Sequence, residues 1–130
     1  MAVYVIDTHA LIWYLIGSTR ISLAARTALD DVVAGGSERH VPAIVPAELV
    51  MLAEKRRLIF DFKRMVETLR SLAGFQFTSL QPDTVLRAQA LVALTDIHDR
   101  LIVAESLESN ATLITRDQAI AASGLASALW

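Results

Sequence analysis

Apolar and polar residues follow two different periods along the chain, one typical of strands and one typical of helices. Residues 3–6 form the first short apolar run, which predicts a buried strand. From residue 8 to 16 the apolar positions recur at helical spacing, so a helix is expected to follow directly. A single carboxylate, Asp7, interrupts this apolar stretch at the point where the strand becomes the helix.

The same two periods continue to the end of the sequence. Further strands are expected over 40–44, 75–80, 111–115 and, as a last short strand, 125–130. Further helices are expected over 22–34, 46–57, 61–73, 82–94, 95–108 and 117–123. Strands that alternate with helices predict an α/β fold, a sandwich around a mostly parallel central sheet.

Some residues mark the expected helix limits. Ser22 is a candidate N-cap, and Pro46 and Pro82 suit the first position of a helix. The segment AGGSER, residues 34–39, predicts a helix end followed by a loop, with Gly35 or Gly36 just past the helix.

The length and apolar content indicate one compact unit with surface to spare. A chain of 130 residues is expected to form a single domain, 1–130. It is 54% hydrophobic with a mean hydropathy of +0.45, which predicts extensive buried surface and a partner interface. Candidates for that interface, of which at least half are expected in the core, are Trp13, Tyr14, Leu58, Ile59, Phe60 and Phe62.

Charge and cysteine content exclude several classes of protein. A secretory signal would begin with Lys or Arg, but neither precedes Asp7. An Asp within a membrane span would cost about 2.5–3.5 kcal/mol. We therefore expect no membrane association. The absence of cysteine excludes disulfides and thiolate metal sites and fits a reducing cytoplasm.

The net charge of −2 bears on nucleic-acid binding. A protein that neutralises phosphates over a broad surface is normally basic, so any such contacts here must be local or must involve metal ions. The basic run at residues 55–57 is more simply interpreted as a solvated helix end.

Four acids fall at expected helix starts: Asp7, Glu48, Asp99 and Asp117. Each alone is explained by the helix dipole, which stabilises a carboxylate in the first turn by about 0.3–1 kcal/mol. Asp96 and Asp99 also resemble a capping box.

Together the acids indicate more than capping. Parallel strands end on one edge of a sheet, so Asp7, Glu48 and Asp117 are expected to lie near one another. Crowded carboxylates raise one another's pKa values and destabilise a fold unless a cation intervenes. Because the chain offers oxygen ligands without Cys or a His pair at ligand spacing, the expected cation is Mg²⁺ or Mn²⁺.

Four stretches carry a resemblance to a known family: VIDTHALIW, VPAELVMLAEKRRL, DIHDRLIVAES and TLITRD. In their order and spacing they make the chain similar to the PIN-domain ribonucleases, and among these to the VapC-type toxins of toxin–antitoxin pairs. The resemblance covers nearly the whole chain and implies a PIN-like three-layer α/β/α sandwich. It departs from the family at VPAE, where a Ser or Thr more often precedes the glutamate.

The resemblance also implies the site and its chemistry. It places the four acidic metal ligands on Asp7, Glu48, Asp99 and Asp117, with Asp96, Thr115 and Thr8 as auxiliary residues. It implies a Mg²⁺- or Mn²⁺-dependent endoribonuclease that cleaves RNA phosphodiesters. Its implied partners are a cognate VapB-type antitoxin, whose C-terminal segment blocks the acidic pocket, and a second copy in a homodimer.

The remaining polar candidates are weaker. His9 and His98 flank acids and are expected to support the site structurally, and His40 is expected at the surface. Arg100 and Arg116 adjoin presumed ligands, and either phosphate binding or an ion pair with an acid fits them.

Other readings of the sequence have specific obstacles. A phosphatase of the haloacid dehalogenase type needs an acid where His9 stands, and a receiver domain needs a late lysine, whereas no lysine follows Lys63. A catalytically inactive PIN-like module that binds RNA or protein remains an alternative, as does a DNA-directed nuclease of the same fold.

Overall fold

The central sheet is entirely parallel. The computed structural model describes residues 2–31, 37–57 and 59–130. Within these residues five strands pair in the order β3-β2-β1-β4-β5, and each neighbouring pair runs parallel. The strands are β1 (Ala2–Ile6), β2 (Ser37–Pro42), β3 (Phe75–Thr78), β4 (Thr112–Ile114) and β5 (Ala128–Leu129).

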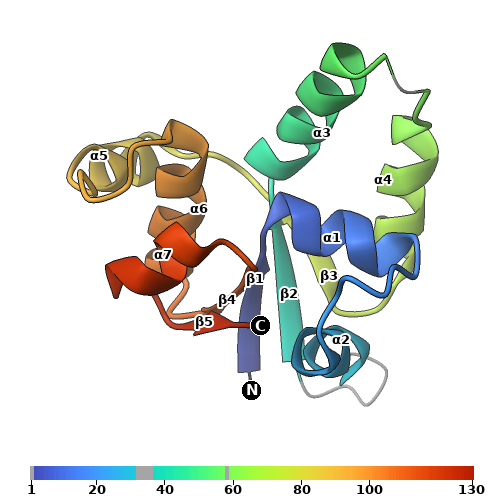
Figure 1. The fold of residues 1–130 in the computed structure, drawn as a ribbon, viewed down its shortest axis with the longest axis horizontal. Helices are drawn as coiled ribbons and strands as arrows, with labels where there is room; N and C mark the ends of the chain where they lie inside the picture. Colours follow the sequence, from blue (N-terminus) through green and yellow to red (C-terminus); the bar gives the residue numbers. More distant parts are fainter. Residues whose placement is uncertain (1, 32–36, 58) are drawn as a thin grey trace.

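The helices form a layer on each side of the sheet (Figure 1). One group comprises α1 (Thr8–Leu15), α2 (Leu23–Asp30), α3 (Ile44–Lys55) and α4 (Phe62–Ser71). The other comprises α5 (Pro82–Gln89), α6 (Ile97–Glu108) and α7 (Gln118–Ser123). The expected three-layer α/β/α sandwich is therefore confirmed.

The direction of winding reverses between β1 and β4. The chain passes outward from β1 to β2 and β3, and then returns to place β4 on the other side of β1. Ile6 pairs with Ile114 at the carboxyl ends of these two strands, and the Asp7 N–H extends the pairing by donating to the Ile114 carbonyl at 3.1 Å. In open parallel sheets such a reversal opens a crevice where ligands bind.

The core fixes this edge of the sheet. Val5 and Ile6 at the end of β1 and Leu113 and Ile114 in β4 are fully buried. On α6 the four consecutive residues 101–104 are all buried, so this helix is enclosed on more than one side and contacts both β1 and β4. The beginning of α6 is thereby held close to the reversal point.

Strand β2 begins earlier than the sequence pattern predicts. It starts at Ser37 instead of residue 40, so the second half of the expected loop over 34–39 is wrong. The polar residues at this position predict a loop, but Arg39 is fully buried and its guanidinium forms hydrogen bonds within the protein. It donates to the Ala28 carbonyl at 3.2 Å and to the Ser37 hydroxyl at 2.9 Å. The expected helix end at Gly35 or Gly36 lies outside the described residues.

Other helix limits differ by a few residues. Helix α3 begins at Ile44, which makes Pro46 its third residue; the N–H of that position has no partner within the helix, so proline fits there. Helix α5 ends at Gln89 instead of residue 94. The predicted roles of Ser22 as N-cap and of Pro82 near the start of its helix are confirmed.

The residues proposed for a partner interface divide between core and surface. Trp13, Tyr14 and Phe62 pack against the core, whereas Ile59 is fully exposed and Phe60 is partly so. Leu58 lies outside the described residues. Among the helices described, none is long and apolar enough to cross a membrane.

His40 does not lie at the surface, contrary to the prediction. It is half-buried in β2, with Nε2 3.2 Å from a Glu38 carboxylate oxygen.

Candidate active site

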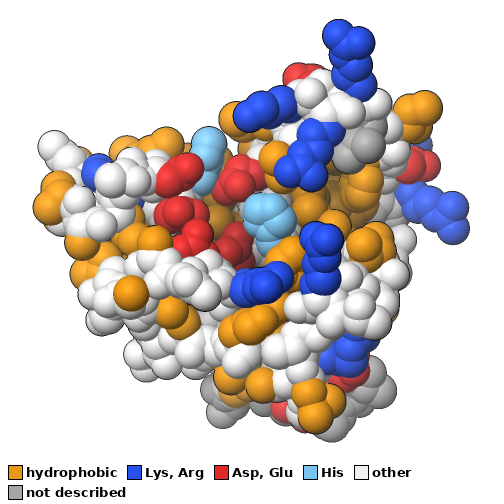
Figure 2. Space-filling model, in the orientation of Figure 1, with side chains coloured by type: hydrophobic (Ala, Val, Ile, Leu, Met, Phe, Trp, Pro, Cys, Tyr) orange, Lys and Arg blue, Asp and Glu red, His pale blue; other side chains and the backbone are white. Residues whose placement is uncertain are grey.

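A pocket of about 700 Å³ opens at the carboxyl edge of the sheet, where the winding reverses. All five acids named from the sequence line it: Asp7, Glu48, Asp96, Asp99 and Asp117. They form a red cluster in a hollow of the face shown in Figure 2. The expectation that acids far apart in sequence would meet is confirmed.

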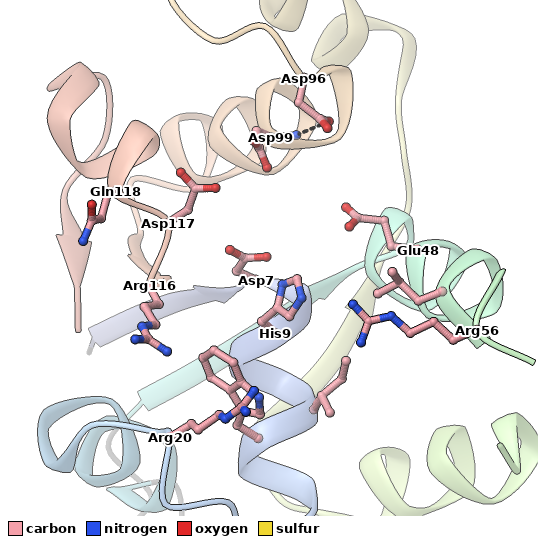
Figure 3. A pocket seen from close by; sticks show the side chains of 13 residues that line it. Asp7, His9, Arg20, Glu48, Arg56, Asp96, Asp99, Arg116, Asp117 and Gln118 are labelled. Carbon is pink, nitrogen blue, oxygen red and sulfur yellow. Dashed lines mark hydrogen bonds between the residues drawn. The ribbon is translucent and has the colours of Figure 1, made fainter. Parts of the chain in front are cut away.

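Asp7 occupies the N-cap position of α1, but its side chain does not cap that helix. Its carboxylate is 8% exposed and accepts a hydrogen bond from the Thr115 hydroxyl, with Oγ1 to Oδ2 at 2.5 Å. Helix capping therefore does not explain why an acid stands at the end of β1. The side chain is instead tied to the neighbouring strand and directed into the pocket (Figure 3).

Thr115 joins two parts of the site. While it donates to Asp7, its oxygen accepts the Asp117 N–H at 3.0 Å. Asp117 in turn caps α7, since its Oδ1 accepts the Ile120 N–H at 3.0 Å. Capping thus accounts for one oxygen of Asp117, and Thr115 holds the loop that presents this residue.

Glu48 lies in the second turn of α3, not the first, because the helix starts earlier than predicted. The helix dipole therefore explains this acid less well than expected. Its Oε1 is buried and has no hydrogen-bond partner among the described residues. The Thr8 hydroxyl lies close enough to lower the pKa of Glu48, although their geometry falls short of a hydrogen bond. Glu48 thus has a threonine hydroxyl from α1 nearby, although the residue before it is Ala47.

Asp96 and Asp99 occupy the start of α6. Asp96 is its N-cap and accepts the N–H groups of His98 at 2.7 Å and of Asp99 at 3.4 Å, as predicted. Asp99 lies in the first turn and lines the pocket with its neighbour. Capping alone explains why an acid stands at position 96.

The acids perturb one another's protonation. Burial, reinforced by Asp117, Asp96, Asp7 and Glu48, raises the pKa of Asp99 to about 7. Burial also raises the pKa of Asp7, which the Thr115 hydrogen bond partly offsets. The pKa of Glu48 is raised chiefly by burial and lowered in part by His98. The pocket therefore favours protons or other cations.

The chemical type of the ligand atoms suits a hard divalent ion. The acids offer only oxygen ligands, and Glu48 contributes a buried oxygen with no other partner. In the described residues, however, no three His, Asp or Glu side chains stand close enough together to bind one ion. The carboxylates line one pocket and shift one another's pKa values, but they do not form a complete coordination site.

Three arginines line the same pocket: Arg20, Arg56 and Arg116. Arg56 is the C-cap of α3, as its interpretation as a helix end predicts, yet it also lies along the pocket. A signal for it was present, because Glu48, Leu52 and Arg56 follow at intervals of four and share one face of the helix. Arg20 comes from the turn after α1, and no sequence pattern marked it.

The other polar candidates have local partners. The Arg116 guanidinium lies over the Trp13 ring, 5.6 Å from its centre, and His9 packs on the same ring at 5.7 Å. Arg100 does not join the pocket; its Nε donates to the Leu94 carbonyl at 2.6 Å. His98 Nδ1 lies 3.4 Å from an Asp96 oxygen.

A family model for the PIN domain matches residues 4–124. The chain belongs to the PIN domain family. PIN domains generally use divalent metal ions, in agreement with the oxygen-rich pocket. Membership of this family supports a hydrolase that acts on nucleic acids. No curated protein sequence matches the chain significantly.

Three solved structures match the fold over nearly the full chain. VapBC2 of Rickettsia felis bound to promoter DNA matches with a TM-score of 0.72 and 15% identity, covering 98% of this chain and 97% of the other. A toxin–antitoxin complex from Klebsiella pneumoniae matches with a TM-score of 0.66 and 23% identity, covering 100% of this chain and 97% of the other. FitAcB from Neisseria gonorrhoeae matches with 0.69 and 16%, covering 98% and 96%. At these identities the likeness is one of fold.

Proposed function

We propose that this PIN domain is a Mg²⁺- or Mn²⁺-dependent endoribonuclease and the toxin of a VapBC-type toxin–antitoxin pair. The observation that carries the proposal is the pocket itself, in which acids from separate segments meet although two of them, Asp7 and Glu48, are not explained by helix capping. RNA is proposed as substrate because the sequence motifs resemble ribonucleases. The likeness in fold to a VapBC complex, to a toxin–antitoxin complex and to FitAcB supports the toxin assignment.

The proposed roles follow from the surroundings of each acid. Asp7, Asp99 and Asp117 would hold the ion directly or through water, and Thr115 orients the first of them. Glu48 completes the acidic set. A bound divalent ion would lower the pKa of water and offset charge on the phosphate.

A side chain of the protein would then accept a proton during cleavage of the phosphodiester. The Glu48 Oε1, which is buried and unpaired, is the proposed acceptor of the proton of the attacking water. The water oxygen forms a bond to phosphorus as the bond to the 3′-oxygen breaks. The products are a 5′-phosphate and a 3′-hydroxyl, the leaving oxygen taking up a proton.

A cleavage assay tests this proposal. Wild-type protein is expected to cut labelled single-stranded RNA with Mg²⁺ or Mn²⁺ and to stop when the ion is chelated. Asp7→Asn and Asp99→Asn are expected to lose at least about 100-fold in rate, because charge stabilisation by a preorganised site is worth this much. Calorimetric titration with Mn²⁺ measures ion binding independently of cleavage.

The control is Asp83→Asn, which changes an exposed acid in the first turn of α5, outside the pocket. It should cleave and bind Mn²⁺ as the wild type does. Wild-type rates in folded Asp7→Asn protein, or cleavage that ignores the chelator, would overturn the metal-nuclease proposal. Faster cleavage of DNA than of RNA with the same sequence would favour the DNA-directed alternative.

The partners belong to the same proposal. We expect a cognate VapB-type antitoxin, encoded beside this chain, and assembly of the toxin into a homodimer. The exposed side chains of Ile59 and Met51 supply apolar surface that such contacts could cover. A monodisperse monomer in light scattering at micromolar concentration would exclude the dimer.

A further inference from the structure

Opposite charges share the acidic pocket without pairing. The arginines of the pocket, which we call the basic rim, are Arg20, Arg56 and Arg116. All three are exposed, and none takes part in the ion pairs found among the described residues. Three cations that line a pocket rich in acids, yet make no salt bridge with them, remain able to bind an anion from solution.

The basic rim occupies a different part of the pocket from most of the acids. In Figure 3, Asp96, Asp99 and Asp117 lie beside α6 and α7, whereas Arg20 and Arg116 lie beside α1. The same pocket is also lined by apolar side chains, Ile12 and Trp13 from α1 and Leu52 from α3. Arg56 lies on α3 with Glu48, so a ligand that crosses the pocket meets arginines and carboxylates in turn.

One of the arginines, Arg116, is held by an aromatic neighbour, and a second is favoured by its position on a helix. Arg116 lies over the Trp13 ring, and a cation is attracted to the face of an aromatic ring. Arg56 caps the carboxyl end of α3, where its charge is favoured by the helix dipole. The rim is thus partly ordered before any ligand binds, which lowers the entropy lost on binding.

We propose that the basic rim binds backbone phosphates of a single-stranded RNA next to the phosphate that is cleaved. The inference rests on the proposed ribonuclease function and adds the residues that hold its substrate. The acidic pocket alone would repel a polyanion, so a strand can enter only where local cations compensate. Arginine suits this role because its planar fork of donors matches the oxygens of a phosphate.

An acidic peptide is the competing ligand for such a rim. The nucleic acid is favoured because the rim adjoins the carboxylates: a strand that spans both sides offers phosphates to the arginines and to an ion held by the acids. A carboxylate-rich peptide forms no favourable contact with the acidic residues unless it also carries Lys or Arg. The pocket thus fits a chain of phosphates better than a chain of carboxylates.

Binding is measured apart from cleavage. Fluorescence anisotropy follows a labelled oligouridylate of about 12 nucleotides, within the range of single-strand sites, in chelator and in an Asp99→Asn background that reduces repulsion. Arg20→Gln, Arg56→Gln and Arg116→Gln are each expected to weaken binding at low salt. Each should also make the slope of log K against log salt shallower by about 0.7, the value for one contact with a single strand.

Arg64→Gln is the matched control, since Arg64 is exposed on α4 and lies outside the pocket. It should leave the slope unchanged. Equal slopes in the rim variants and in this control would overturn the proposal, as would an oligoglutamate that displaces the RNA at equal charge concentration. A wild-type chain that binds RNA through the rim but cleaves no RNA would refute the nuclease and leave the rim assignment standing.

A kinetic test separates binding from chemistry in the active enzyme. With Mg²⁺ present, Arg20→Gln and Arg56→Gln should raise KM for RNA several-fold and leave kcat near the wild-type value. Trp13→Leu should weaken RNA binding through Arg116, whereas in the double variant with Arg116→Gln the tryptophan change should add nothing further. Full additivity of the two changes would contradict the positioning role of Trp13.

Discussion

At the scale of single residues, Thr115 shows how a neutral side chain shapes an acidic site. Its hydroxyl donates to Asp7 and accepts from the backbone of Asp117, so the ends of β1 and β4 are joined through one oxygen. Because Asp7 directly follows β1 and Thr115 directly follows β4, the hydrogen bond between them restrains the orientation of the carboxylate. Such outer partners of metal ligands commonly set the affinity of the site.

Thr115→Val should therefore weaken Mn²⁺ binding and RNA cleavage by about 10–100-fold, the usual cost of losing an outer partner of a ligand. Valine keeps the shape of threonine but cannot donate to Asp7. The matched control is Thr84→Val, which removes an equally buried hydroxyl that bonds to Glu108, away from the pocket. Similar losses in both variants, measured by Mn²⁺ titration, would indicate a general effect on folding.

Single residues also show why the sequence revealed the acids more readily than the arginines. Asp7 and Asp117 were recognisable because they follow apolar strands, and strand ends of a parallel sheet meet. Arg20 follows α1 in a turn, where nothing in the local pattern says which way it faces. Glu48 was identified as an acid of the site but misplaced in its helix, because proline suggested a start two residues late.

At the scale of elements, the order of strands and helices followed from hydrophobic periods, whereas β2 was mispredicted at its start. The polar sequence Ser-Glu-Arg predicts a loop, yet Arg39 is completely buried beneath α2. A buried arginine is compatible with a strand only if its donors find acceptors, and here the Ala28 carbonyl and Ser37 supply them. No periodicity in sequence encodes that arrangement, because the acceptors lie on a different element.

Arg39→Ala is expected to lower the free energy of unfolding by about 2–4 kcal/mol. The change leaves the Ala28 carbonyl without its donor and opens a cavity between β2 and α2. Chemical denaturation measures the loss. Arg64→Ala, an exposed arginine on α4, should change stability by no more than about 0.5 kcal/mol. Equal stability of the two variants would show that the buried guanidinium contributes little.

At the scale of the whole molecule, the acidic pocket is a local concentration of charge in a chain whose net charge is only −2. Asp7, Glu48 and Asp99 all have raised pKa values, Asp99 to about 7. In the unfolded chain these groups titrate near pH 4. Between pH 4 and about 7 the folded protein therefore binds more protons than the unfolded chain, and its stability falls as the pH rises.

The melting temperature of the metal-free protein is accordingly expected to fall as the pH rises from about 4 to about 7, with the carboxylates in this pocket responsible for part of the slope. Saturating Mg²⁺ should reduce that part. Asp99→Asn should also reduce it, because the amide does not ionise, and should melt above the wild type at neutral pH without divalent ions. Scanning calorimetry over this range provides the measurement. Identical pH profiles for Asp99→Asn and wild type would contradict the shifted carboxyl.

The winding of the sheet also imposes an order in time. The pocket needs Asp7 from the end of β1 and Asp117 from the loop after β4, so Asp7 is synthesised well before Asp117. Since β4 pairs directly beside β1, no nascent chain that stops short of it can align these two carboxylates. If the protein is a toxin, chains that end before β4 lack the aligned pair, and an inhibitor produced alongside the toxin can accumulate during the interval between the synthesis of β1 and that of β4.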